Sequence, residues 1–190
     1  MSGEPPASQR HFIALRLDDV AAHRAAAVDV PEGARRVPEE DLHVTLAFLG
    51  TLDARGEASA RAAMAEAAQN LPAPRVRLDQ LEFWREAIVL CAEPAASPDA
   101  AGLLAARLND ALARREVRVQ ALPFRAHVTI ARLRRREALP PRPLRSPVVW
   151  VPDELVLLAS RAGAAAAPRY HAVHRMAFAG AMPRMSPLLR

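Results

Sequence analysis

The chain has 190 residues, a formal net charge of +5 and a pI near 10.9, and every one of its 26 basic residues is arginine. This positive balance favours a phosphate-bearing partner and argues against an acidic one. The single cysteine, Cys91, excludes an internal disulfide and a cysteine-based zinc site. The polar N-terminus lacks the apolar stretch of a signal peptide, and no run approaches the roughly 20 apolar residues of a membrane span. We therefore expect a soluble, cytoplasmic protein.

The composition predicts how the core is built. Half of the residues are hydrophobic, at 51%, whereas aromatic residues make up only 4%. Leucine, valine and alanine should therefore fill the core, with few large side chains. The length fits one domain over residues 1–190, built of two lobes and ending in loose tails at 1–9 and 181–190.

In chain order, the first half of the sequence predicts two strands that alternate with two helices. The ranges are a strand at 11–17, a helix from Asp18 or Asp19 to about residue 28, a loop at 31–41, a strand at 42–49 and a helix at 53–69. The second half predicts a hairpin at 75–84 and 86–92, a helix from Ser97 or Asp99 to about Arg115, and a strand at 124–133.

The remaining segments predict a strand-rich end. Residues 134–147 are so rich in proline that we expect a connection rather than a helix or a central strand. Short strands follow at 148–151 and 154–159, then a turn at 161–168 and a last strand at 170–178. Helices packed on antiparallel strands predict an α+β fold.

One short pattern occurs twice in the predicted strands, as His43-Val44-Thr45-Leu46 and His127-Val128-Thr129-Ile130. Because side chains alternate along a strand, each histidine shares one face with its threonine, and the aliphatic residues share the other face. A single copy is more often a half-buried histidine without a function. Two copies in the same register predict that two imidazoles and two hydroxyls line one cleft.

Those four groups suit chemistry at a phosphate. Of the pair His43 and His127, one imidazole can donate a proton while the other accepts one. The hydroxyls of Thr45 and Thr129 can donate hydrogen bonds to non-bridging phosphate oxygens. Zinc sites add a third histidine, a carboxylate or a cysteine, and neither motif has one nearby. We therefore expect no metal and no cofactor.

The two tetrapeptides resemble the paired signature of the two-histidine phosphoesterases. Within that group the chain is most similar to the RNA 2′,3′-cyclic phosphodiesterases of the bacterial and archaeal 2′-5′ RNA ligase (LigT-like) family. The likeness covers about residues 10–178, and the supporting segments are HFIALRL, DLHVTLAFLG, PFRAHVTIARLR, and ELVLLAS followed by Tyr170.

The resemblance implies two similar α+β lobes around a central cleft, with one motif in each lobe. It implies hydrolysis of the 2′,3′-cyclic phosphate end of RNA or an oligonucleotide to a 2′-phosphomonoester. His43 would be the proton donor and His127 the proton acceptor, although the sequence by itself leaves these roles open. We expect a monomer without an obligate protein partner.

Two departures from the family pattern bear on substrate binding. Ala47 stands where the family often has a basic residue, and by alternation this position faces the site. Ala126 replaces the usual proline before the second histidine. Arg125 lies two residues before His127, so by alternation it shares the same face and is expected to bind the substrate phosphate in compensation.

Three further residues are less easily placed. Arg132 matches a family arginine and is a second candidate for substrate binding, although alternation directs it away from the site. Tyr170 is a third candidate, and Phe48 falls on the core face. Two other functions stay open: action on another cyclic or 2′,5′-linked nucleotide, and RNA binding without catalysis.

Overall fold

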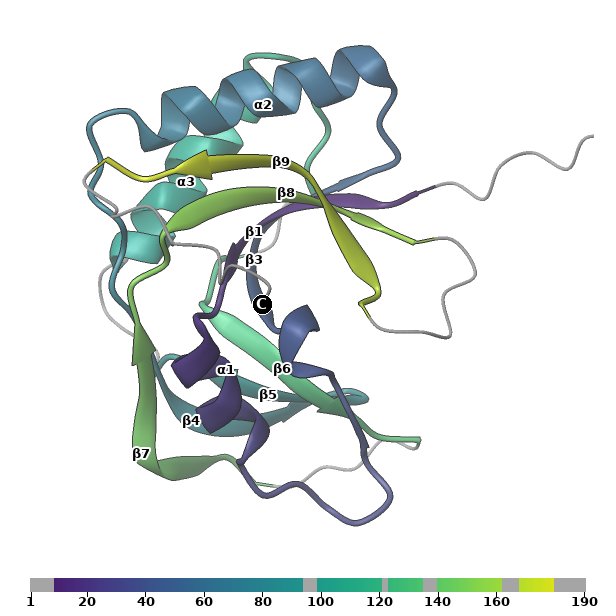
Figure 1. Ribbon diagram of the computed structural model, residues 1–190, viewed down its shortest axis with the longest axis vertical. Helices are drawn as coiled ribbons and strands as arrows, with labels where there is room; N and C mark the ends of the chain where they lie inside the picture. The colour runs from purple at the N-terminus through teal and green to yellow at the C-terminus, as the bar shows by residue number, and fades with distance from the viewer. Residues whose placement is uncertain (1–8, 94–98, 121–122, 135–139, 162–167, 180–190) are drawn as a thin grey trace, which may run out of the picture.

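The computed structural model describes residues 9–93, 99–120, 123–134, 140–161 and 168–179. Figure 1 shows an α+β fold, as the sequence predicts. The helices are α1 (Asp19–Ala26), α2 (Ala54–Ala68) and α3 (Ala100–Ala113), with a 3-10 turn η1 at Glu39–Asp41. The strands are β1 (His11–Arg16), β2 (Arg35–Arg36), β3 (His43–Gly50), β4 (Val76–Trp84), β5 (Ala87–Cys91), β6 (His127–Arg132), β7 (Arg142–Trp150), β8 (Glu154–Ser160) and β9 (Tyr170–Ala177).

The strands form one open antiparallel sheet that consists of two halves. Its order is β7-β4-β5-β6-β3-β1-β8-β9, and the two-residue β2 pairs with β6. At the centre, β3 meets β6 through the single residue pair Val44 and Val128. Each half therefore contains one of the two histidine-threonine motifs, and the two motifs lie on the strands that join the halves.

Each helix begins after an aspartate that caps it. The carboxylates of Asp18, Asp53 and Asp99 each accept a hydrogen bond of 2.7 Å from the backbone N–H three residues later. Such a cap satisfies an N–H group that the helix itself leaves without a partner, and it stabilises the helix by about 1 kcal/mol. Ser97, the other expected cap for α3, lies outside the described residues.

The core lies between the helices and the sheet and has the predicted composition. In Figure 1, α2 and α3 lie together over the half formed by β3, β1, β8 and β9, and α1 lies beside β7. The largest fully buried side chains are leucines, isoleucines and one methionine, Met64. Alanines fill the buried faces of α1 and α2, because a small side chain lets a helix approach its neighbours closely.

The proline-rich segment differs from the prediction. Residues 142–147 belong to β7, which pairs only with β4 and forms one edge of the sheet. An edge strand tolerates proline because the N–H groups on its open side have no partner to lose. Pro143 and Pro147 are therefore compatible with the strand, and the prediction of a connection was wrong from Arg142 onward.

Some predictions fall on segments that the structure does not describe. These are the terminal tails, except for residue 9, and most of the expected turn at 161–168. Within the described residues, no helix combines the length and the apolar character that a membrane crossing requires.

Candidate active site

The two histidine-threonine motifs line one cleft at the junction of the two halves. His43, Thr45, His127 and Thr129 are half-buried and border a common cavity of about 150 Å³. Val44 and Val128 lie on the opposite face of the same strands and are fully buried. The alternation of polar and apolar residues thus places all four polar side chains on the wall of one cavity.

The two imidazoles are oriented in the same way. Nδ1 of His43 lies 2.6 Å from the backbone carbonyl of Asp41, and Nδ1 of His127 lies 2.9 Å from that of Arg125. A carbonyl oxygen only accepts hydrogen bonds, so Nδ1 of each ring donates. In the neutral ring, Nε2 then carries the lone pair, and it is the nitrogen that can exchange a proton with a ligand in the cleft.

Burial favours the neutral form of both imidazoles. Burial is the largest of the effects that together lower the pKa of His43 to about 4; the hydrogen bond to the Asp41 carbonyl opposes it, and the nearby Arg16 guanidinium adds to it. Burial also lowers the pKa of His127; the hydrogen bond to the Arg125 carbonyl opposes this effect, and the charge of the Arg125 guanidinium adds to it. The neutral form of both rings is therefore favoured at pH 7. A bound phosphate anion would raise both pKa values, because a nearby negative charge stabilises the imidazolium.

Aromatic rings fix the position of each histidine. The rings of Phe12 and His43 have centroids 4.8 Å apart, and Tyr170 packs edge-on against both. On the other side, Trp84 lies 4.6 Å from His127. The Trp84 side chain is only partly buried, and its ring supports a histidine of the cleft.

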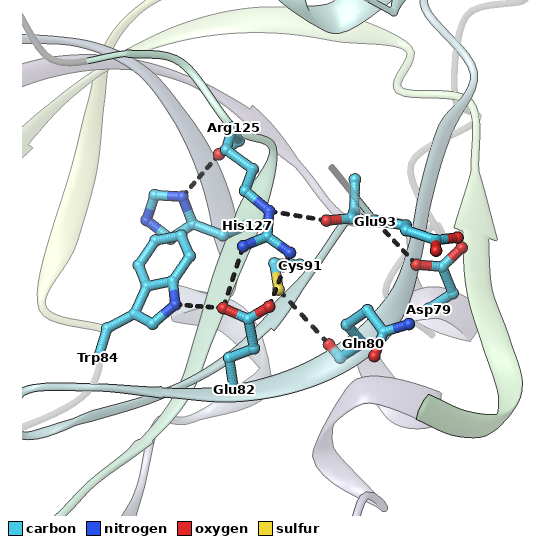
Figure 2. Close-up of polar contacts among 9 residues, drawn as sticks. Asp79, Gln80, Glu82, Trp84, Cys91, Glu93, Arg125 and His127 are labelled. Carbon is cyan, nitrogen blue, oxygen red and sulfur yellow. Dashed lines mark hydrogen bonds and ion pairs between the residues drawn. The ribbon is translucent and has the colours of Figure 1, made fainter. Parts of the chain in front are cut away.

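Figure 2 shows a hydrogen-bonded network behind His127. The Glu82 carboxylate accepts bonds of 2.8 and 3.0 Å from Arg125 and one of 2.7 Å from Nε1 of Trp84. Nε of Arg125 also donates to the Ala92 carbonyl at 2.8 Å. The network therefore holds both the carbonyl that orients His127 and the ring that packs against it.

This network places Arg125 differently from the expectation that it binds the substrate phosphate. Its guanidinium is paired with Glu82, and Arg125 is not among the residues that line the cleft. Alternation does not apply to Arg125, because β6 begins only at His127. Ala126, the residue before His127, lacks the ring by which a proline would stiffen the backbone. The side-chain bonds of Arg125 restrain the backbone at this place instead.

We expect Glu82→Gln to lower the kcat of a reaction in the cleft on the order of tenfold and to leave its KM nearly unchanged. Hydrogen bonds to charged groups contribute about 1.5–3 kcal/mol, and their loss lets the ring of His127 turn. The matched control is Glu66→Gln, whose carboxylate holds Arg114 and Arg115 between α2 and α3, away from the cleft. Steady-state kinetics of both variants checks this prediction. Equal kcat values for the two variants would contradict it.

A β-bulge in β3 reverses the alternation after the first motif. Thr45 pairs with Ala14, whereas Ala47 pairs with Ile13, so that one extra residue stands between the two pairs. As a result Ala47 is buried in the core, and Phe48 is 48% exposed and borders the cleft. The predictions that Ala47 faces the site and that Phe48 faces the core were therefore wrong.

β6 carries a bulge at the equivalent position. Thr129 pairs with Val89, whereas Ala131 pairs with Ile88, again with one extra residue between them. Ala131 is consequently buried, and Arg132 is exposed and borders the cleft, although simple alternation directs it elsewhere. Phe48 and Arg132 thus occupy corresponding places after the two motifs.

Asp41 links the first histidine to the last strand, and sequence reasoning missed it. Its carboxylate is only 3% exposed and accepts bonds of 3.0 and 3.1 Å from the backbone N–H of Arg169. The neighbouring Tyr170 borders the cleft, as expected for a substrate-binding candidate. Asp41 therefore orients His43 through its carbonyl and places Tyr170 through its carboxylate. The only sequence signal for this role of Asp41 was its position, as an acidic residue just before the buried strand β3.

No metal site accompanies these residues in the described part of the chain. No group of three histidine, cysteine, aspartate or glutamate side chains there is arranged to hold a metal ion. Proton transfer, hydrogen-bond donation and positive charge are the chemical means that the cleft residues themselves supply. Arg35 and Arg36 of β2 add to that charge at the cleft wall.

An α+β fold of two halves, with a histidine-threonine strand from each half over one cleft, matches the architecture of the two-histidine phosphoesterases. A family model described as the 2′-5′ RNA ligase superfamily matches residues 6–164. The chain belongs to that superfamily. No curated protein sequence matches the chain at a significant level.

Solved structures agree with this assignment. Escherichia coli LigT in complex with 3′-AMP is 27% identical, with a TM-score of 0.68 over 91% of this chain and 99% of LigT. A structure described as a phosphoesterase is 28% identical, with the same TM-score of 0.68 over 90% of this chain and 98% of its own. A protein of Thermus thermophilus, at 24% identity and a TM-score of 0.64 over 89% and 97% of the two chains, shares the fold.

Proposed function

We propose that the protein hydrolyses the 2′,3′-cyclic phosphate end of RNA to a 2′-phosphomonoester, by acid–base catalysis without a metal. The observation that carries this proposal is the convergence of two imidazoles, oriented alike, and two threonine hydroxyls on one cleft. The similar E. coli LigT has been solved with 3′-AMP and with phosphate, which supports a nucleotide phosphate as the ligand.

In the proposed reaction, His127 accepts a proton from a water molecule through Nε2, and the water oxygen forms a bond to phosphorus. The bond between phosphorus and the ribose 3′ oxygen breaks, and His43 donates its proton to that leaving oxygen. Thr45 and Thr129 donate hydrogen bonds to the non-bridging oxygens, whose charge grows as water attacks. Proton exchange with solvent then restores both histidines.

The lowered pKa of His43 sets a condition on its role as donor. An imidazole with a pKa of about 4 is unprotonated near neutral pH and has no proton to donate there. The phosphate anion must first raise that pKa enough for the proton to bind. Arg132 and Tyr170, which border the cleft, are proposed to contact the rest of the substrate.

The pKa shifts predict two displaced pH profiles. The kcat/KM profile reports the free enzyme, in which the pKa of His43 is about 4 and that of His127 lies below 6.5. Its bell should therefore be centred below pH 6.5. The kcat profile reports the complex, in which phosphate raises both pKa values, so its bell should be centred at higher pH. Both profiles can be measured with one cyclic substrate, and a kcat bell centred below that of kcat/KM would contradict the account.

The activity itself is tested with a dinucleotide that ends in a 2′,3′-cyclic phosphate. We expect multiple turnovers in the presence of EDTA. The reaction should give a single product, which carries a terminal phosphomonoester. Loss of turnover in EDTA that one divalent ion restores would show metal catalysis instead. Binding of the dinucleotide without any hydrolysis would identify an RNA-binding protein of the same fold.

A further inference from the structure

The active-site cleft adjoins a second and larger groove. This groove has a volume of about 920 Å³, compared with about 150 Å³ for the cleft. The two share a wall, because Phe12, Phe48, Arg132, Arg169 and Tyr170 border both. The groove therefore lies directly beside the cleft that holds the two histidines.

Arginines dominate the lining of the groove. Arg10, Arg118, Arg132, Arg161 and Arg169 border it, all five are exposed, and no aspartate or glutamate lies among the lining residues. In the described segments, none of these five arginines forms an ion pair with a carboxylate. They come from separate parts of the chain, at the ends of β1, β6, β8 and β9 and after α3. The fold thus gathers unpaired positive charge beside the cleft.

Phe48 adds a surface on which a base can stack. Its ring is 48% exposed, and it stands on the boundary that the cleft and the groove share. Single-stranded nucleic acid binds where a positive groove follows the backbone and an aromatic ring contacts the bases, since every base has a π-face. An acidic peptide would satisfy the arginines but would leave this ring without a partner.

We propose that the groove binds the sugar–phosphate backbone of the nucleotides that precede the cyclic phosphate end, so that the enzyme prefers an RNA strand to a mononucleotide. This inference rests on the proposed function, because the reacting end must lie between His43 and His127. The phosphates upstream of that end then pass Arg118 and Arg161, which border the groove but not the cleft.

The test compares a 2′,3′-cyclic mononucleotide with a trinucleotide that ends in the same cyclic nucleotide. For the double variant Arg118→Glu/Arg161→Glu, we expect KM for the trinucleotide to rise roughly tenfold. The slope of log KM against log[salt] should become shallower by about 0.7 for each phosphate contact that is lost. The values for the mononucleotide should change much less. The matched control is Arg107→Glu, an exposed arginine of α3 that borders neither the cleft nor the groove.

Two results would overturn the proposal. One is an unchanged KM for the trinucleotide in the double variant, and the other is an equal rise for both substrates. If the wild-type protein hydrolyses neither substrate, the proposed function fails, and the groove is then tested by binding alone. Fluorescence anisotropy with a labelled trinucleotide should still show weaker binding by the double variant than by Arg107→Glu, and equal binding would reject the groove.

Discussion

Replacing His127 by alanine is expected to lower kcat by about two to four orders of magnitude, because a positioned acid or base contributes roughly that much to the rate. His43→Ala should have an effect of the same size. The double variant should lose little more than either single one, since the two imidazoles act on the same transition state as a unit. Single-turnover kinetics with a cyclic-phosphate oligonucleotide measures all three.

The control for these variants is His23→Ala, because His23 is an exposed histidine of α1 whose ring lies beside Glu39 and does not border the cleft. Its kcat should equal that of the wild type. Because the ring of His43 packs against Phe12, thermal unfolding of each variant must be compared as well. A folded His43→Ala or His127→Ala variant that keeps its turnover would rule out the acid–base pair.

Replacing Thr45 or Thr129 by valine is the change with the next largest expected effect. Each substitution removes one hydrogen bond to a charged phosphate, worth about 1.5–3 kcal/mol, so kcat/KM should fall by about 10- to 150-fold. Valine has nearly the shape of threonine and is equally compatible with a strand, so the fold should be retained.

Two further substitutions make this result specific. Thr45→Ser retains the hydroxyl and should recover most of the activity. Thr51→Val changes an exposed threonine just beyond β3 and should have no effect. If Thr45→Val and Thr129→Val are no more impaired than Thr51→Val, the hydroxyls do not contact the reacting phosphate.

The cleft could be predicted from sequence because the alternation within each motif is local. Val44 and Val128 must be buried, and this alone turns the neighbouring histidines and threonines to the other face. The alternation fails one residue later at each bulge, where the pairing partner sets the register. The partners of Ala47 and Ala131 are Ile13 and Ile88, which are far away in the sequence.

The surroundings of the histidines were harder to predict for the same reason. Glu82, which holds Arg125 and Trp84, lies on β4, and no local pattern connects it with the second motif. The path of β7 was missed because proline excludes a central strand but not an edge strand, and edge position depends on the whole topology. Local periodicity therefore identified the four polar groups of the cleft, whereas non-local pairing determined what supports them.

Phosphorus NMR of the product formed in isotopically labelled water, with EDTA present, tests the central claim most directly. The two histidines are proposed to direct water to phosphorus and to expel the 3′ oxygen. The account predicts a 2′-phosphomonoester that carries one labelled oxygen, formed by the wild type and about two to four orders of magnitude more slowly by His127→Ala. A 3′-phosphomonoester, an unlabelled product or an unchanged cyclic phosphate would contradict it.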